Sequence, residues 1–336
     1  MDLSVIIVNY KSAFHVLNCI ESIYQHTTKH SFEIIVVDND SSDDSETKIL
    51  SAYPAVIWLQ TGYNAGFARA NNVGIRKATG ENILLLNADT IVLDGALDKT
   101  IDLFQQTPDA VGCGVQLLNS DGSHQISGAH FIKGGLNFLL PLPYLGRFVR
   151  FLGYKLNTRP PSVKEVSKTE EVDWIVGAFI VVRSEVLKES GLLDEDFFMY
   201  AEEIEWCSRL RKQGKLYLFE EPKVIHLGGG TSSDYYETDE NENSKNLWNK
   251  KARQIIVSQM LRIRKQYGMA WFLAIWGFFI IEIPVFVIGL LCEKLFRFGK
   301  SRFGWKDVSG YIKNMIYLLN YILKIIRNKP FFYKAY

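Results

Sequence analysis

The chain has 336 residues, of which 47% are hydrophobic and 22% charged, a composition that excludes a largely disordered polypeptide and predicts one or two globular domains. The formal net charge is +1, but the segment from Glu293 to the end carries ten Lys and Arg residues against two acids, a net of +8 that leaves −7 for residues 1–292. A basic segment on an acidic body indicates an anionic partner surface. Its aromatic, Leu and Ile residues, without a nucleic-acid-binding motif, favour a membrane over nucleic acid.

The cysteine pattern indicates a reducing compartment. None of the four cysteines forms a CxxC pair or is spaced like a zinc ligand, so buried free thiols are expected at Cys19, Cys113, Cys207 and Cys292. The apolar start "LSVIIVNY" is short and lacks a basic leader, so we expect a strand there and no signal peptide.

The first 120 residues alternate between strand and helix patterns. Short β-branched or apolar runs predict strands at 3–10, 32–40, 56–61 and 82–89. Helical spacing predicts helices at 12–25, within 41–50, at 66–80 ending at Gly80, and at 94–108 ending near Pro108. Continuous apolar strands separated by helices predict an α/β fold with a mostly parallel sheet covered on both faces.

The middle of the chain is less regular. Residues 125–170 are rich in Gly, Pro and aromatic residues and are interpreted as a loop or flap. The pattern at 171–191 predicts a strand followed by a helix, and 194–214 predicts a helix that ends at Gly214. "KLYLFE" and "KVIHLGGG" are predicted to be two short strands, and 231–267 a polar stretch followed by a basic helix.

Residues 269–292 form an apolar segment with one charge, Glu282, and one proline, Pro284. At about 1.5 Å per residue the segment is long enough to span the hydrocarbon core. Basic residues on both sides give no clear orientation, and the Glu282-x-Pro284 break leaves open two half-helices that enter and return. The pattern at 310–329 predicts a basic amphipathic helix in the membrane interface, and a buried core helix with a solvated tail is the alternative. The expected organisation is a catalytic domain at 1–230, a helical connector at 231–268 and membrane-associating helices at 269–336.

Polar residues follow the predicted strands. Asn9-Tyr10, Asp38-Asn39, "GYNAGFARANN" and Asn87-Ala88-Asp89 stand after the first four strands in turn. Ligands of open α/β sheets bind outside the carboxyl ends of the strands, so these groups are candidates to bind a base, a sugar or a cation. No strand is followed by a Walker A sequence, and no GxGxxG follows the first strand, which disfavours P-loop and dinucleotide-binding proteins.

Seven segments, in order, resemble family-2 glycosyltransferases of the GT-A fold, most closely the rhamnosyltransferase branch of bacterial surface-polysaccharide synthesis. The resemblance covers roughly residues 3–230 and rests on "SVIIVNY", "IIVVDNDSSDDS", "GYNAGFARANNVGI", "ILLLNADTIV", "VDWIVGAFIVVRSEV", "GLLDEDFFMYAEEIEWCSRLRKQG" and "HLGGGTS". It implies a GT-A catalytic domain, a nucleoside-diphosphate sugar as donor and a divalent cation, Mg²⁺ or Mn²⁺, as cofactor.

The resemblance implies donor-binding roles for residues after the strands. Asp38 matches the position that accepts a hydrogen bond from the imide of uracil or thymine, with Asn9 and Tyr10 lining the same pocket. Asn64 and Asn72 match recurrent asparagines, although Asn71 stands where many relatives have Arg.

Asn87-Ala88-Asp89 matches the DxD-type motif. With Asn87 in place of the first carboxylate, Asn87 is expected to contact the sugar and Asp89 to bind the metal, helped by His226 at the end of "KVIHL". A cation there would neutralise charge that develops on the leaving diphosphate.

Glu202-Glu203 matches the Glu-Asp pair whose second member is the general base, so Glu203 is predicted to be the catalytic residue, one methylene longer than the usual Asp. Glu202, Trp174 and Gly177 are assigned to the acceptor and sugar pocket. Glu205 and Arg209 stand at helix-pairing spacing and are expected to give structural support.

Each of these residue types also has a structural alternative. Asn87 and Asp89 suit a turn, Asp38 suits a helix cap, and the acids at 202–205 suit an ordinary charged helix face. A lone His is more often structural, and Trp174 fits core packing equally well.

The resemblance implies inverting transfer of a sugar, rhamnose in the branch that the chain resembles most, to a lipid-linked glycan at the cytoplasmic side of the membrane. The alternatives are a catalytically silent glycan-binding or scaffold protein and a nucleotidyltransferase on a related sheet.

Overall fold

A computed structural model describes residues 1–131, 137–158, 160–228, 246–296 and 301–335. The chain divides into two compact units. The first comprises Met1–His130, Ser162–Phe198 and Glu202–Tyr235, and the second Phe131–Pro161, Met199–Ala201 and Tyr236–Tyr336. The second unit thus includes residues 131–161 as well as the C-terminal helices, and the functional limits 1–230, 231–268 and 269–336 stay a prediction.

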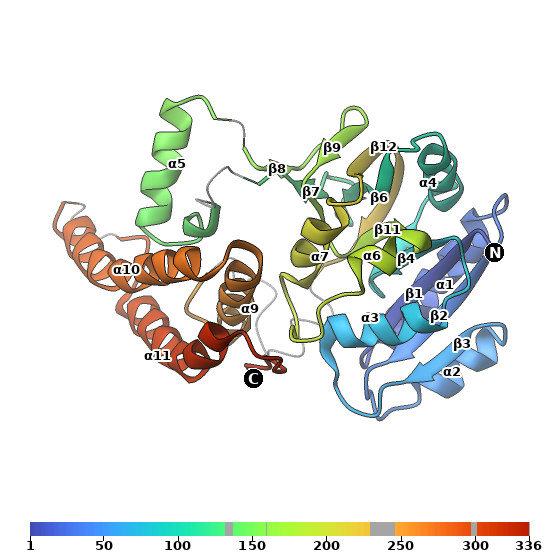
Figure 1. Ribbon diagram of the computed structural model, residues 1–336, viewed down its shortest axis with the longest axis horizontal. Coiled ribbons are helices and arrows are strands. Elements are labelled where there is room, and N and C mark those ends of the chain that lie inside the picture. The colour runs from blue at the N-terminus through green and yellow to red at the C-terminus, as the bar shows by residue number, and fades with distance from the viewer. Residues whose placement is uncertain (132–136, 159, 229–245, 297–300, 336) are drawn as a thin grey trace. The chain divides into compact units, whose positions relative to one another are not determined.

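The first unit is built on a nine-stranded mixed sheet (Figure 1). Its parallel half has the order β3-β2-β1-β4, with the strands β1 (Leu3–Asn9), β2 (Phe32–Asp38), β3 (Ile57–Gln60) and β4 (Asn82–Leu86). The order continues with β11 (Phe179–Arg183), β6 (Ala110–Leu118), β12 (Lys215–His226) and β5 (Thr90–Val92), and β9 (Glu170–Val172) pairs with β12. β11 is antiparallel to β4 and β6, so the sheet is mostly but not wholly parallel. A small second sheet has the order β10 (Trp174–Ile175), β7 (Gly128–Ala129) and β8 (Ser162–Val163).

Helices cover both faces of the large sheet, as predicted. Successive residues of β1 point to opposite faces, so Val5 and Ile7 enter one core cluster and Ile6 enters the other. The first cluster takes residues from α1 (Ala13–His26), α2 (Ser45–Ala52) and α4 (Ala96–Gln105). The second takes residues from α3 (Gly66–Lys77), α6 (Leu187–Ser190), with the 3₁₀ turn η2 (Ser184–Val186) before it, and α7 (Glu202–Leu210). Burial on both faces is what selects continuous apolar strands in place of alternating ones.

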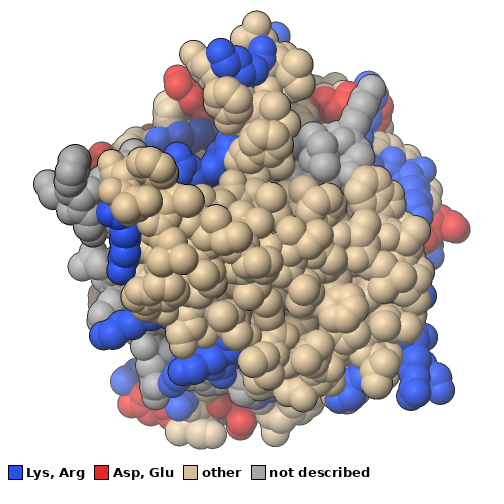
Figure 2. All heavy atoms as spheres, turned by 90° about the vertical axis from the view of Figure 1, so that its left-hand side faces the viewer, with Lys and Arg blue, Asp and Glu red and all other residues tan. Residues whose placement is uncertain are grey.

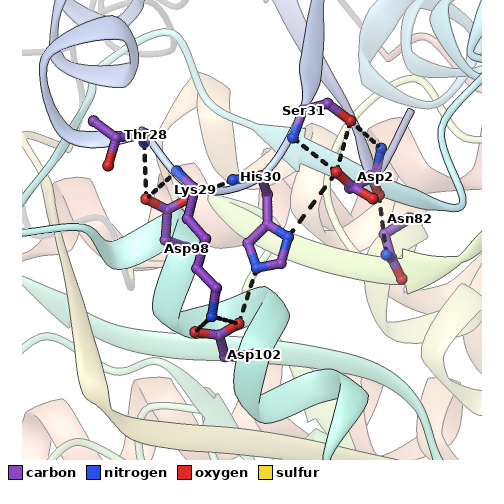
Figure 3. A network of polar contacts seen from close by, with 8 residues as sticks. All are labelled: Asp2, Thr28, Lys29, His30, Ser31, Asn82, Asp98 and Asp102. Carbon is purple, nitrogen blue, oxygen red and sulfur yellow. Dashed lines mark hydrogen bonds and ion pairs between the residues drawn. The ribbon is translucent and has the colours of Figure 1, made fainter.

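The amino ends of the strands are tied by a polar network (Figure 3). The Asp98 carboxylate on α4 accepts backbone N–H groups from Thr28, Lys29 and His30, between α1 and β2. Asp102, one turn later, pairs with Lys29 Nζ at 2.6 Å and His30 Nε2 at 2.9 Å. These contacts stabilise the amino-end edge of the sheet. The candidate site lies at the opposite edge, at the carboxyl ends of the strands.

Two features predicted for the middle of the chain are corrected. Residues 125–170 are not only loop, since they contain β7, β8, the start of β9 and a helix, α5 (Leu145–Lys155), and residues 132–136 and 159 lie outside the described residues. The two predicted strands "KLYLFE" and "KVIHLGGG" are one strand, β12, whose register shifts between Phe219 and Lys223. The shift absorbs Pro222, which has no N–H for the sheet.

The described part of the second unit is helical, with α5, α9 (Lys250–Tyr267), α10 (Met269–Phe296) and α11 (Trp305–Arg327). The two half-helices do not form, because α10 is continuous with Pro284 inside it. By length and composition α10 is able to cross a membrane. All four cysteines are free thiols, as expected, but Cys292 on α10 is exposed and not buried.

Candidate functional site

The strand register brings three polar side chains to one rung at the carboxyl edge. Asn9, Asp38 and Gln60 are paired across β1, β2 and β3. Asn9 is fully buried, donates to Asp38 Oδ1 at 2.7 Å, and accepts from the N–H of Ser12 at 3.2 Å. Its amide therefore links β1 to β2 and to the start of α1.

Asp38 lies beside a surface pocket. Its carboxylate accepts from Asn9, from the Ser41 N–H at 3.0 Å and, with the Gln60 amide turned to satisfy its neighbours, from Gln60 at 3.0 Å. The pocket is lined by Asp38, Asp40, Ser42, Asp43, Ser45, Glu46, Trp58 and Gln60. Its acidic lining suits groups that donate hydrogen bonds, such as hydroxyl and imide groups, and disfavours phosphate. Tyr10 is half-buried just after β1, with Lys11 Nζ 5.7 Å from its ring centroid.

The segment "NAGF" forms a tight entry into α3. Asn64 Oδ1 accepts from Asn39 Nδ2 at 3.3 Å and from the Gly66 N–H at 3.2 Å. Gly66 has φ +72°, and a Cβ there would lie 2.1 Å from Phe198 O, so no other residue fits without moving the backbone.

Asn72 is buried in α3 and bonded to the chain before α7. It donates to Leu193 O at 2.9 Å and to Glu195 Oε1 at 3.1 Å, and it accepts from the Leu193 N–H. The structure therefore gives Asn72 a positioning contact, and its predicted contact with the donor stays a prediction.

Asn87, Asp89 and His226 come together at the end of β4. The apolar strand stops at Leu86, and the turn that follows places Asn87 Nδ2 3.4 Å and Asp89 Oδ1 3.4 Å from His226 Nε2. His226 reaches this position because β12 pairs with β5, where His226 lies opposite Thr90. The predicted metal residues, 137 positions apart in the chain, are thus neighbours in space.

Gln125 fixes the orientation of the His226 ring. Gln125 Nε2 donates to Asn119 Oδ1 at 2.9 Å and to the backbone oxygen of His226 at 3.0 Å, which leaves Gln125 Oε1 to face His226 Nδ1 at 2.8 Å. A carbonyl oxygen only accepts, so Nδ1 carries the proton. Nε2 is then available to Asn87 and Asp89. Metal-binding histidines characteristically donate their second N–H in this way.

The residues fit a divalent cation, although they do not complete its coordination. Burial raises the pKa of the Asp89 carboxyl, but the neighbouring His226 outweighs burial, so the pKa lies below its ordinary value and the carboxylate is ionised at neutral pH. A carboxylate oxygen and an imidazole nitrogen suit Mn²⁺ or Mg²⁺. Among the described residues no cluster of three or more His, Cys, Asp or Glu side chains could hold a metal ion, so the pair would supply two ligands at most.

The predicted base Glu203 reaches the same edge. Glu202 and Glu203 open α7, with Glu202 buried and Glu203 half-buried. A Cβ built on Gly177 would lie 3.6 Å from Glu203 Cγ, and the next residue, Ala178, accepts the N–H of Asn87 at 3.0 Å. Glu203 and Asn87 are therefore linked through two adjacent residues, 177 and 178. Trp174, half-buried, lies in β10 just before them.

Glu205 and Arg209 form the expected structural pair, which is confirmed. The Arg209 Nε and Nη2 atoms bind the Glu205 carboxylate at 2.8–3.1 Å, and Nη2 also donates to Leu192 O. The pair anchors α7 to the chain before it and keeps Glu205 from the role predicted for Glu203.

Sequence reasoning did not identify several residues of this edge. They are Gln125, Trp58, Gln60, Ser41 and His15. Gln125 falls in the segment interpreted as a loop, and no periodicity marks it. His15 Nδ1, in the first turn of α1, is buried and has no hydrogen-bond partner within the described part of the chain, so it is a further candidate to bind the donor.

The family model "Glycosyl transferase family 2" matches residues 4–190, which is more than half of the chain. The chain belongs to glycosyl transferase family 2. The match begins in β1, contains the Asn87-Ala88-Asp89 turn and ends before α7.

This family-2 glycosyltransferase is similar to two curated proteins. It is 30% identical over 221 residues to the low-salt glycan biosynthesis hexosyltransferase Agl10 of Haloferax volcanii, covering 63% of this chain and 62% of that protein. It is 27% identical over 239 residues to an N-acetylglucosaminyl-diphospho-decaprenol L-rhamnosyltransferase of Mycobacterium tuberculosis, covering 67% of this chain and 75% of that protein.

The fold matches solved GT-A structures. The structure of GalNAc-T7 with UDP, GalNAc and Mn²⁺ superposes with a TM-score of 0.51 at 16% identity, over 79% of this chain and 50% of that one. At this identity the likeness confirms the GT-A fold predicted from the sequence.

Proposed function

We propose that the protein is an inverting glycosyltransferase that moves a sugar from a nucleoside diphosphate to a lipid-linked glycan in surface-polysaccharide synthesis. The sugar that we propose is rhamnose. The convergence of Asn87, Asp89 and His226 on one strand edge, with Glu203 linked to it through residues 177 and 178, carries this proposal. The names of the haloarchaeal and mycobacterial relatives support glycan synthesis, and the second supports rhamnose and a polyprenyl-diphosphate acceptor.

Inverting transfer requires a general base for the acceptor hydroxyl. It also requires that this hydroxyl attack the anomeric carbon from the side opposite the leaving diphosphate. Glu203 takes the proton of the acceptor hydroxyl while its oxygen bonds to the anomeric carbon, and the bond from that carbon to the diphosphate breaks on the opposite face. Gly177 leaves the space beside Glu203 free of a side chain, so an acceptor hydroxyl has room there. Glu202 and Trp174 are assigned to the walls of the same pocket.

The donor would lie along the carboxyl edge of the parallel strands. Asp38, held by Asn9 and flanked by Tyr10, would receive the base, and Asn64 and Asn72 would hold the loop and helix that border the donor. Asn87 would contact the sugar. A divalent cation bound by Asp89 and His226 would supply the positive charge that the leaving diphosphate needs.

The proposal includes the location of the enzyme at a membrane surface. A lipid-linked acceptor lies at a membrane surface, and the apolar helix α10 together with the basic C-terminal residues would hold the enzyme at the cytoplasmic side.

A transfer assay tests this function. The full chain is incubated with Mn²⁺ or Mg²⁺, dTDP-rhamnose and a polyprenyl-diphosphate-linked N-acetylglucosamine, beside UDP-sugars as alternative donors. Product with an inverted anomeric centre is the expected result. Donor binding by thermal shift without transfer or hydrolysis of any donor would instead identify a silent glycan-binding protein.

A further inference from the structure

The outer side of α10 is apolar although none of the described residues covers it. The buried stripe of α10 consists of Phe272, Ile275, Phe279, Glu282, Phe286 and Leu290, at spacings of three and four. The exposed large apolar side chains are Trp271, Leu273, Phe278, Ile280, Ile281, Ile288, Leu291, Leu295 and Phe296. A helix on a water-exposed surface carries polar residues on its outer side. Here the one acid of the segment 269–292 is on the inner side.

That inner acid, Glu282, binds α10 to α5. Its two carboxylate oxygens accept the N–H groups of Tyr144 at 2.6 Å and Leu145 at 3.0 Å. These N–H groups belong to the start of α5, where a helix has unpaired donors and a partial positive charge. The Tyr144 ring also packs on Gly289, where a Cβ would lie 2.6 Å away. A helix from the middle of the chain is thereby fixed next to α10.

α5 and α11 continue the exposed apolar surface. On α5 and just after it the exposed residues are Phe148, Phe151, Leu152, Tyr154 and Leu156, accompanied by the exposed cations Arg147, Arg150 and Lys155. On α11 they are Trp305, Ile316, Leu319 and Leu323, accompanied by Lys306, Lys313, Lys324 and Arg327. Figure 2 shows this side of the second unit: a broad area without charged atoms, with Lys and Arg at several points of its border.

We propose that α5, α10 and α11 form one docking face that lies flat in the interface of an anionic membrane. The exposed Trp, Phe, Leu and Ile side chains enter the boundary of the hydrocarbon, and the bordering Lys and Arg bind lipid phosphates. This inference rests on the membrane location in the proposed function and adds to it the orientation of α10 and the participation of α5.

One observation favours a flat orientation over a spanning one. The inner side of α10 packs on α9 and α11, which carry buried polar contacts such as Asn314 Nδ2 to Leu247 O at 3.0 Å and Gln254 Nε2 to Ser258 Oγ at 2.9 Å. A spanning α10 would draw these groups into the hydrocarbon, whereas a flat one leaves them above it.

The charge pattern distinguishes the bilayer from a second copy of the chain. In a two-fold dimer through this face, the bordering Lys and Arg of each copy would meet those of the other. An anionic bilayer instead offers phosphates to the bordering cations, of which Arg147 also lies 3.4 Å from Glu293 Oε1.

Vesicle flotation of the full chain tests the face. We expect flotation with phosphatidylcholine vesicles that contain phosphatidylglycerol, and less with phosphatidylcholine alone. The double variant Phe148→Ser/Phe151→Ser on α5 should bind at least about tenfold more weakly, because burying each aromatic ring contributes about a factor of ten. Phe14→Ser replaces another exposed phenylalanine, on α1, and is the control that should bind as the parent chain does. Equal binding by the α5 variant and the parent would overturn the role of α5.

Spin-label depth tests the orientation. Cys292 is the one exposed thiol of the four and takes the label directly. Trp271→Cys and Ile281→Cys in a Cys292→Ser background label the other end and the middle of α10. Three similar, shallow depths, about 5–10 Å below the headgroups, are expected. A deep middle with shallow ends would show a spanning helix, and failure to bind vesicles with concentration-dependent dimerisation would show a second copy; either result overturns the proposal. Both assays are independent of glycosyl transfer, so the docking face and the proposed function fail separately.

Discussion

His226 Nδ1 lies 2.8 Å from Gln125 Oε1, and this contact decides which ring nitrogen faces Asp89. The Gln125 amide has no freedom to turn, because its nitrogen already donates to the backbone oxygen of His226 and to Asn119. The ring nitrogen Nε2 is thereby presented to the turn after β4 before any ligand arrives.

Gln125→Ala should weaken Mn²⁺ binding by about 10–100-fold, because the ring loses the acceptor that sets its tautomer and orientation. Gln125→Glu keeps an acceptor oxygen for the ring but loses the donors to Asn119 and to the backbone oxygen of His226, so it should retain part of the affinity and bind more tightly than the Ala variant. Titration of the protein with Mn²⁺, followed by the electron paramagnetic resonance signal of the free ion, measures both. Equal affinities for the parent and the Ala variant would contradict the positioning role.

Asp89→Asn should lower Mn²⁺ affinity and transfer together, with transfer falling by at least about a hundredfold. The substitution keeps the size of the side chain, and the melting temperature serves as the control for folding. Asp40→Asn, on the nearby pocket rim but away from His226, should leave Mn²⁺ affinity unchanged. A fully active Asp89→Asn protein would remove Asp89 from the site.

Glu203→Gln should reduce the transfer rate by about 10²–10⁴-fold while donor binding persists, because only proton removal is lost. Glu205→Gln, two positions along the same helix, is the matched comparison. It weakens a bidentate contact with Arg209, so we expect a lower unfolding free energy and a smaller effect on the rate. Single-turnover rates and urea unfolding of both variants separate the two roles, and the reverse pattern would exchange the assignments.

Asp102 should stabilise the fold only above acidic pH. Its hydrogen bonds with Lys29 and then His30 hold its pKa below the ordinary value of 3.8 (Figure 3). Because the pKa of Asp102 is lower in the folded than in the unfolded chain, its contribution to the unfolding free energy is fully present above the unfolded-state pKa. This contribution is lost as the pH falls through the pKa of the folded state. Between about pH 5 and about pH 3 the parent should lose more unfolding free energy than Asp102→Asn, by less than about 1 kcal/mol for this partly exposed pair. Transfer at neutral pH should not change, since the network lies at the amino ends of the strands.

Glu282→Ala should destabilise the second unit by about 1–3 kcal/mol, because two N–H groups of α5 lose their acceptor inside the protein. Glu282→Gln keeps one oxygen and should cost less. Hydrogen exchange of the α5 amides, expected to accelerate in the Ala variant first, is the measurement. Unchanged exchange in both variants would show that α5 does not depend on Glu282.

Local patterns sufficed for much of the fold. The apolar runs that became β1, β2 and β4 and the helical spacing of α1, α3 and α4 are short-range signals, so the parallel half of the sheet could be predicted. α5 could not, because its Gly and aromatic residues give no clear alternation of polar and apolar positions and its start is satisfied by Glu282, 137 positions beyond Leu145. The local pattern predicts two strands in place of β12, because Pro222 is typical of a strand end. In the structure β12 pairs with β6 on both sides of the register shift, and this pairing keeps it one strand.

The sequence by itself determined the family-like motifs, the buried strand Ile83–Leu86 and the polar turn that follows it, since residue type and periodicity are local properties. The tertiary structure alone decided that His226 and Gln125 meet that turn, that Asn72 bonds to residues 193–195, and that Glu282, the one acid of residues 269–292, faces inward. These outcomes depend on strand order and helix packing, which bring together groups more than a hundred residues apart, and no pattern along the chain encodes such distances.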